Sequence, residues 1–183
     1  MPTSNPSIIS FVSNQIIKFK PQSFLDLGCG FGKYGVLARE YGDIWRAERY
    51  YPEQWKVRID AVEIFDKYIT QLHKYVYNNI YIENIYDFIK NYNKEPYDMV
   101  ICIGVIEHFY EDIGKEILSE LKHKMKYCIV TTPVNCRKQG AVLDNIYEKH
   151  LSSWTKELLE LYGDVFIKEG VYYLEINKDI SWM

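Results

Sequence analysis

The stretch that decides the fold has the sequence Asp26-Leu27-Gly28-Cys29-Gly30-Phe31-Gly32. It follows a short apolar run, Ser23–Leu27, and it precedes a helical pattern over residues 31–40. Glycines suit a tight turn between a strand and a helix, because a backbone without Cβ atoms can approach a ligand closely. In an open α/β sheet, ligands bind beyond the carboxyl ends of the strands. The stretch therefore predicts a cofactor-binding turn after the first strand.

Three classes of cofactor-binding loop could explain this turn. A P-loop requires Ser or Thr after its lysine, but Tyr34 follows Lys33, and the glycines are one residue too close together. The dinucleotide fingerprint G-x-G-x-x-G fits the first two glycines, but the third comes one residue early. The pattern acid-x-G-x-G-x-G, typical of S-adenosylmethionine sites, is matched in full. The remaining alternative is that the glycines serve only the tight turn.

A second candidate for cofactor binding is Glu63, near the end of the apolar run 57–64, which is predicted as the second strand. A carboxylate at this place can accept hydrogen bonds from both hydroxyls of a ribose. Its separation from Gly32 exceeds the roughly 20 residues of the dinucleotide fingerprint, so residues 41–56 are predicted to form an insertion. The alternative for Glu63 is a solvated acid at a strand end.

Apolar runs and helical patterns alternate along the rest of the chain. The densest run, 99–103, has no polar alternation, which is typical of a central parallel strand that is covered on both faces. Runs 165–168 and 171–176 flank Glu169-Gly170, a hairpin signal. The pattern predicts one α/β domain over residues 1–183: a doubly wound, Rossmann-like, seven-stranded mixed sheet with helices on both faces and a C-terminal antiparallel hairpin.

Composition and charge narrow the classes of function. With 183 residues and a net charge of −3, the chain suits a single core, and nucleic-acid binding is not expected. No stretch approaches the ~18 apolar residues of a membrane span, so no membrane partner is expected. Cys102 and Cys128 lie in predicted strands and are expected to be buried free thiols. Together with an N-terminus unlike a signal peptide, they predict a cytoplasmic location.

The aromatic content of 16%, with 17 tyrosines, is high for one small domain. Three segments are predicted to shape an acceptor site, because the cofactor fold takes up nearly all of the chain: the N-terminal helix within 1–20, the insertion 41–56 and the substrate-side loop 133–153. Aromatic faces can stack on sugars and rings. The candidate lining residues are Tyr41, Trp45, Tyr50, Tyr51, Trp55 and Tyr147, whereas Tyr68, Tyr75 and Tyr77 are expected to pack on helices.

Further segments make the chain similar to the class I S-adenosylmethionine-dependent methyltransferases of the bacterial small-molecule and glycan branch. Residues 103–109, with the sequence Ile-Gly-Val-Ile-Glu-His-Phe, resemble the segment that follows the fourth strand in this family. Thr131-Thr132-Pro133 resembles the end of the fifth strand, and 145–154 resembles a loop that precedes the next helix. The resemblance covers about residues 20–176.

The resemblance implies S-adenosyl-L-methionine as the cofactor, with the glycine loop at its methionine end and Glu63 at its ribose. Asn84 stands where the family often has an Asp that contacts the adenine, and Gly104 also replaces a frequent Asp. The implied cofactor-binding residues are Asp26, Gly28, Cys29, Gly30, Gly32, Glu63, Ile64, Asn84, Ile85, Gly104 and Val105.

Histidines are the candidates for catalysis, because a hydroxyl acceptor benefits from a general base whose pKa lies near neutral pH. His108 follows the fourth strand and His150 precedes the helical pattern 154–162; each is a candidate base or substrate ligand, or else serves only backbone groups of its loop. Glu107 is expected to cap or orient the loop. His73 and His123 lie near lysines on predicted helices and are expected to be solvated. No spacing of histidines and acids predicts a metal site.

The expected function is transfer of a methyl group to oxygen or nitrogen of a small-molecule or glycan acceptor. A non-catalytic domain that binds the cofactor or a partner remains an alternative. A nicotinamide-dependent oxidoreductase is disfavoured by the glycine spacing. An RNA methyltransferase is disfavoured by the net charge and by the lack of an Asn/Asp-Pro-Pro-Tyr type of motif after the fourth strand.

Overall fold

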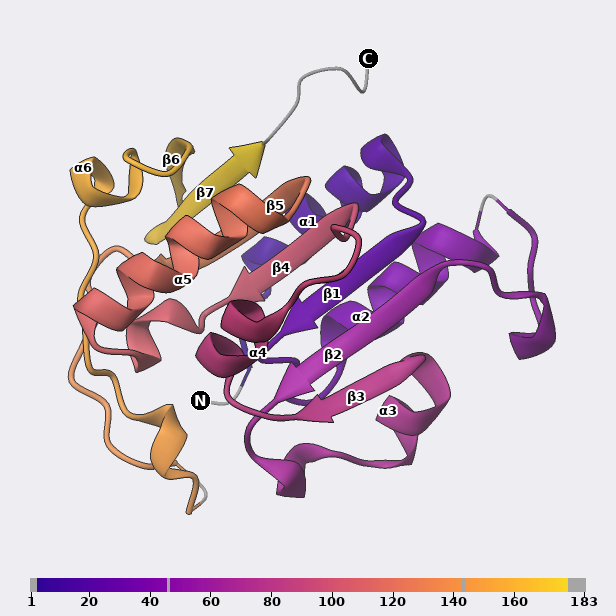
Figure 1. Cartoon of the computed structure of the whole chain (residues 1–183), viewed down its shortest axis with the longest axis horizontal. Coiled ribbons are helices and arrows are strands. Elements are labelled where there is room, and N and C mark those ends of the chain that lie inside the picture. The colour runs from indigo at the N-terminus through magenta and orange to yellow at the C-terminus, as the bar shows by residue number, and fades with distance from the viewer. Residues whose placement is uncertain (1–2, 46, 143, 178–183) are drawn as a thin grey trace.

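The computed structural model describes residues 3–45, 47–142 and 144–177 (Figure 1). Within these ranges the chain forms one seven-stranded sheet in the order β3-β2-β1-β4-β5-β7-β6. The strands are β1 (Ser23–Leu27), β2 (Arg58–Glu63), β3 (Asn79–Ile82), β4 (Met99–Ile103), β5 (Tyr127–Pro133), β6 (Asp164–Lys168) and β7 (Val171–Asn177).

The first five strands run parallel, and β7 lies antiparallel between β5 and β6. The order of connection reverses at β1, which pairs with β2 on one side and with β4 on the other. In doubly wound sheets this reversal opens a crevice at the carboxyl ends of the strands. The predicted fold class, including the C-terminal antiparallel hairpin, is confirmed.

Helices cover both faces of the sheet, with α4 and α5 in front of it and α1 and α2 behind it in Figure 1. Period-two alternation in the strands creates the two apolar faces: Phe24 of β1 packs on one side, whereas Leu25 and Leu27 pack on the other. Helices α1, α2 and α3 bury the first face, and α4, α5 and α6 bury the second. The helices are α1 (Ser7–Phe19), α2 (Lys33–Arg39), α3 (Gln71–Val76), α4 (Ile85–Asn91), α5 (Glu111–Lys124) and α6 (Lys156–Leu159).

Two predicted helices have other bounds than their patterns suggest. Within the pattern over 31–40, helix α2 begins only at Lys33, because Gly32 has a left-handed φ of 82°. The helix then continues as a π-helical turn, Glu40–Ile44. The pattern over 154–162 forms only α6, whose first turn is capped by the Thr155 side chain, which accepts a hydrogen bond from the backbone N–H of Leu158.

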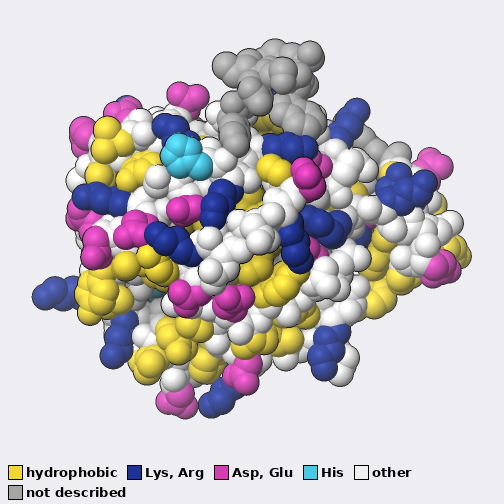
Figure 2. Space-filling view, in the orientation of Figure 1, with side chains coloured by type: hydrophobic (Ala, Val, Ile, Leu, Met, Phe, Trp, Pro, Cys, Tyr) yellow, Lys and Arg dark blue, Asp and Glu magenta, His cyan; other side chains and the backbone are white. Residues whose placement is uncertain are grey.

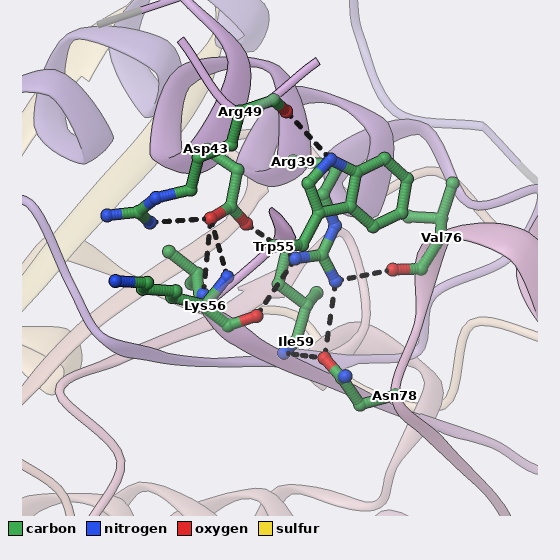
Figure 3. Close-up of polar contacts among 9 residues, drawn as sticks. Arg39, Asp43, Arg49, Trp55, Lys56, Ile59, Val76 and Asn78 are labelled. Atoms are coloured by element: carbon green, nitrogen blue, oxygen red, sulfur yellow. Dashed lines mark hydrogen bonds and ion pairs between the residues drawn. The ribbon is translucent and has the colours of Figure 1, made fainter. Parts of the chain in front are cut away.

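Residues 41–56 are held to the body of the protein by one buried carboxylate (Figure 3). Asp43 is fully buried, and its two oxygens accept hydrogen bonds from Arg39 Nη1 at 2.6 Å and Arg49 Nη1 at 2.8 Å. The backbone N–H of Lys56 donates a further bond at 2.8 Å. The Arg39 guanidinium also lies 4.4 Å from the centre of the Trp55 ring. This network fixes the path of the chain between α2 and β2.

The visible surface carries charges of both signs, and the two cysteines of the predicted strands lie in the core. Figure 2 shows acidic and basic side chains interspersed over the face that carries α4 and α5. Among the described helices, none is both long enough and apolar enough to span a membrane. Cys102 and Cys128 are buried free thiols, as predicted.

Candidate functional site

A cavity of about 740 Å³ lies at the carboxyl ends of the parallel strands. Its size is within the ~300–1,000 Å³ range of small-molecule pockets. The loops that follow β1, β2, β3, β4 and β5 all contribute to its wall, as do the N-terminal residues Thr3, Ser4 and Asn5. The cavity therefore occupies the crevice that the strand order predicts.

The glycine loop forms the part of the wall that follows β1. Gly28, Cys29 and Gly30 line the cavity, and Gly28 has a φ of 74°. A Cβ atom on Gly28 would lie only 2.6 Å from Cγ2 of Val105, which follows β4. Glycine is therefore required at this position both by its left-handed backbone and by the close approach of the two loops. Gly32 is not among the lining residues.

Glu63 links β2 to the glycine loop. Its Oε2 accepts a hydrogen bond from the backbone N–H of Gly30 at 3.0 Å, and its Oε1 accepts one from the N–H of Phe65 at 2.9 Å. The side chain lines the cavity, and its burial raises the pKa of the carboxyl group. Because a carboxylate oxygen can accept more than one bond, both oxygens keep acceptor capacity for ligand hydroxyls.

Asp26 lies beneath the loop and does not line the cavity. It is 2% exposed, and its Oδ2 accepts a 2.6 Å hydrogen bond from the hydroxyl of Tyr77. Burial raises the pKa of Asp26 to about 7. Asp26 thus lies below the cavity wall, where Tyr77 does more than pack, and the contact of Asp26 with the cofactor's methionine end stays a prediction.

We expect the Asp26→Asn variant to lose part of the pH dependence of folding stability. The folded pKa of Asp26 is raised, so its contribution to stability is fullest below the unfolded value of 3.8 and is lost as the pH rises toward 7. Relative to the wild type, the variant should be more stable at about pH 8 than at about pH 5 by at most roughly 3 kcal/mol, because only the part of the pKa shift between pH 5 and 7 falls within this window. Urea unfolding of the wild type and the variant at both pH values measures the stability difference between the two proteins. The same stability difference at pH 5 and at pH 8 would contradict the prediction.

His73 was predicted to be solvated, but in the structure it is buried. Its side chain is fully buried beside the glycine loop. The backbone N–H of Thr70 donates to His73 Nδ1 at 3.1 Å, so Nε2 carries the proton and donates to the carbonyl oxygen of Gly30 at 2.9 Å. His73 thus braces the loop from α3. Its lysine neighbours in the sequence suggested exposure, whereas His123 is exposed as expected.

The residues implied for the nucleoside end also line the cavity, next to the glycine loop. Ile64, Asn84 and Ile85 all contribute to it. The side-chain oxygen of Asn84 caps helix α4 by accepting a bond from the N–H of Tyr86 at 2.9 Å. The oxygen that could contact an adenine therefore also serves the start of this helix. Gly104 and Val105, after β4, complete the implied set of lining residues.

Two histidines that are far apart in the sequence meet at the cavity wall. The rings of His108 and His150 lie 5.0 Å apart, and both residues line the cavity. His108 follows β4, and burial lowers its pKa. His150 belongs to the loop 133–153, drawn in orange in Figure 1. Backbone N–H groups of Leu151 and Ser152 donate to the carbonyl oxygen of Glu107 at 2.8 and 3.2 Å, which keeps this loop against the end of β4.

Glu107, which lies between the end of β4 and the loop 133–153, lines the cavity, and the sequence did not predict this. It is 3% exposed and lines the cavity, and its Oε2 has no hydrogen-bond partner among the described residues. Burial raises the pKa of its carboxyl group to about 7. One donor atom each from Glu107, His108 and His150 lie within 4.8 Å of one another. The sequence placed Glu107 beside His108, but only the fold brings His150 to them.

The insertion 41–56 was predicted to help shape the acceptor site, but it lies away from the cavity. None of its described residues lines the cavity, and the segment lies at the opposite edge of the sheet, on the right in Figure 1. Trp45, Tyr50 and Tyr51 are exposed there. The prediction that this segment lines the acceptor site is therefore wrong. The aromatic residues that do line the cavity are Phe31, Tyr34, Tyr68, Tyr86, Phe109, Tyr110 and Tyr147.

Comparisons with known proteins give distant relatives in sequence and solved structures with the same fold. No family model matches the chain. Over 177 residues the chain is 23% identical to ubiquinone biosynthesis O-methyltransferases from two strains of Rickettsia bellii, OSU 85-389 and RML369-C, covering 95% of this chain and 68% of each relative.

Two solved structures illustrate the structural likeness. A SAM-dependent methyltransferase from Archaeoglobus fulgidus matches with a TM-score of 0.60 and 21% identity, over 85% of this chain and 65% of that one. The N-terminal domain of EvdMO1, with SAH bound, matches with a TM-score of 0.57 and 11% identity, over 94% of this chain and 80% of that one. The chain spans less than two thirds of the Archaeoglobus protein. Its fold is that of the class I S-adenosylmethionine-dependent methyltransferases.

Proposed function

We propose that the protein transfers a methyl group from S-adenosyl-L-methionine to an oxygen or nitrogen atom of a small-molecule or glycan acceptor. The observation that supports this most strongly is the cradle formed by Gly28, Gly30 and Glu63. A Cβ atom on Gly28 would close the gap to Val105. The Glu63 carboxylate lines the cavity with acceptor capacity to spare, which suits the two hydroxyls of a ribose.

S-adenosylmethionine supplies a methyl group bonded to a positively charged sulfur. The protein's task is then mainly to hold donor and acceptor in line, because proximity and orientation supply much of the rate when the leaving group is neutral. The glycine loop and Glu63 would hold the nucleoside and methionine parts. The residues after β4 and in the loop 133–153 would hold the acceptor, with Tyr147, Leu151 and His150 on the cavity wall.

His108 and His150 are the candidates to take the proton of a hydroxyl acceptor. Both rings border the cavity, and burial lowers the pKa of His108, which favours its neutral, proton-accepting form. In both rings Nδ1 donates a hydrogen bond to a backbone carbonyl oxygen, so Nε2 is the nitrogen that can act as a base. Neither Glu107 nor Asp26 offers an equally accessible base, since both are almost completely buried.

The test is release of S-adenosylhomocysteine in the presence of a panel of phenols, catechols, monosaccharides and primary amines. We expect at least one class of acceptor to raise the release well above the acceptor-free blank, and we expect the product to gain one methyl group in its mass spectrum. Tight binding of S-adenosylmethionine without release for any acceptor class would contradict transfer and favour the alternative of a non-catalytic binding domain.

A further inference from the structure

We propose that Glu107, His108 and His150 bind one divalent transition-metal ion in the wall of the cavity. The three residues come from two distant parts of the chain, the 3-10 turn Ile106–His108 after β4 and the loop before α6. Their donor atoms already lie within 4.8 Å of one another. An ion at about 2.1 Å from each donor brings them within roughly 4 Å, so binding requires only small side-chain movements.

The hydrogen bonds of both histidines orient them as metal ligands. His108 Nδ1 lies 3.1 Å from the carbonyl oxygen of Lys149, and His150 Nδ1 lies 2.6 Å from that of Arg137. A carbonyl oxygen can only accept, so each Nδ1 carries the proton and each Nε2 keeps its lone pair. A bound ion would take up both lone pairs, so in the metal-bound protein the ion, rather than either histidine, would promote loss of the proton from an acceptor hydroxyl. Metal-bound histidines nearly always donate their other N–H in this way, which fixes the tautomer and the orientation of the ring.

Glu107 presents an unpaired buried oxygen at the same place. A carboxylate that is 3% exposed, with no hydrogen-bond partner on Oε2 among the described residues, is costly to bury unless a cation compensates it. The hydroxyl oxygen of Thr131, which also lines the cavity, likewise has no partner among the described residues. This wall of the cavity therefore contains two polar groups that a bound ion and its ligands would satisfy.

The donor set indicates the kind of ion. Two imidazoles and one carboxylate favour iron, cobalt or zinc over magnesium or calcium, which prefer oxygen donors. Three protein ligands leave coordination positions open toward the cavity. The next step rests on the proposed function: an acceptor with an oxygen donor, such as a hydroxyl or carboxylate, would bind at these positions and be fixed beside the methyl donor.

The test is titration of the metal-free protein with Co²⁺, followed by visible absorption. We expect the wild type to bind about one equivalent with d–d bands from mixed nitrogen and oxygen ligands. Glu107→Gln and His150→Ala should each weaken binding at least about 30-fold, because they remove direct ligands and changes in the outer shell alone cost about 10–100-fold. His123→Ala, at an exposed position on α5, is the matched control and should bind as the wild type does.

The proposal is overturned if the wild type shows no such bands, or if both ligand variants bind Co²⁺ as tightly as the control. Calorimetry with S-adenosylmethionine on the same metal-free proteins separates this result from the proposed function. Retained cofactor binding without Co²⁺ binding would refute the metal site alone, whereas Co²⁺ binding without cofactor binding would refute the proposed function alone. Circular dichroism of each variant shows whether it has kept the fold.

Discussion

The Glu63→Ala variant is expected to bind S-adenosylmethionine at least about 100-fold more weakly than the wild type, because it loses charge-assisted hydrogen bonds worth about 1.5–3 kcal/mol each. The loss has two sources. Under the proposed function the carboxylate would accept hydrogen bonds from the ribose, and in the structure it accepts the N–H groups of Gly30 and Phe65, which hold the glycine loop in position. Calorimetry measures the change in affinity directly.

Two further variants separate these sources. Glu63→Gln keeps one oxygen acceptor but turns an N–H₂ group toward a backbone donor, so we expect an intermediate loss of affinity. Glu83→Ala removes a nearby carboxylate that does not line the cavity and should leave affinity unchanged. Wild-type affinity in Glu63→Ala would refute the assignment of this residue to the cofactor.

The Asp43→Ala variant is expected to lose about 3–5 kcal/mol of folding stability, because removal of one partner leaves a buried charge without compensation. Asp43 is fully buried, and it pairs with Arg39, whose side chain is only 4% exposed. It also accepts the backbone N–H groups of Lys56 and Val57, which lead into β2. Urea unfolding followed by circular dichroism measures the free-energy change.

The control for this variant is an ion pair at the surface. Glu116 pairs with Lys90 at 2.7 Å, and both side chains are about half exposed. Exposed ion pairs contribute little to stability because water and salt screen them, so Glu116→Ala should change the free energy of unfolding little. Similar small effects for Asp43→Ala and Glu116→Ala would show that the Asp43 network does not anchor residues 41–56.

The fold could be predicted from the sequence because its signals are local. The run 99–103 lacks polar alternation and forms the fully buried β4, and the signal at Glu169-Gly170 forms the hairpin between β6 and β7. The left-handed glycines that follow β1 likewise lie where the sequence placed them. Each of these inferences needed only neighbouring residues and a periodic pattern.

The site was predicted less completely, because several of its contacts join distant residues. His73 and Tyr77 support the glycine loop from α3 and the residue after it, through Gly30 and Asp26. Neither contact has a signature in a single sequence. The pairing of His150 with His108 depends in the same way on the path of the loop 133–153.

The sequence did contain a signal that residues 41–56 lie away from the cavity. In a parallel α/β unit, the segment that joins a helix to the next strand returns to the amino edge of the sheet, whereas ligands bind at the carboxyl edge. Residues 41–56 precede β2 and follow α2, so this rule places them away from the cavity, as the structure does. Their aromatic composition suggested a binding role that their position in the topology excludes for this cavity.

Calorimetric titration of the wild-type protein with S-adenosylmethionine, and in parallel with NAD, tests the central claim most directly. The cavity built from Gly28, Gly30 and Glu63 predicts saturable binding of S-adenosylmethionine and of its demethylated product at about one site per chain, and no heat of binding for NAD. Saturable binding of NAD, or no binding of S-adenosylmethionine, would contradict the proposed function.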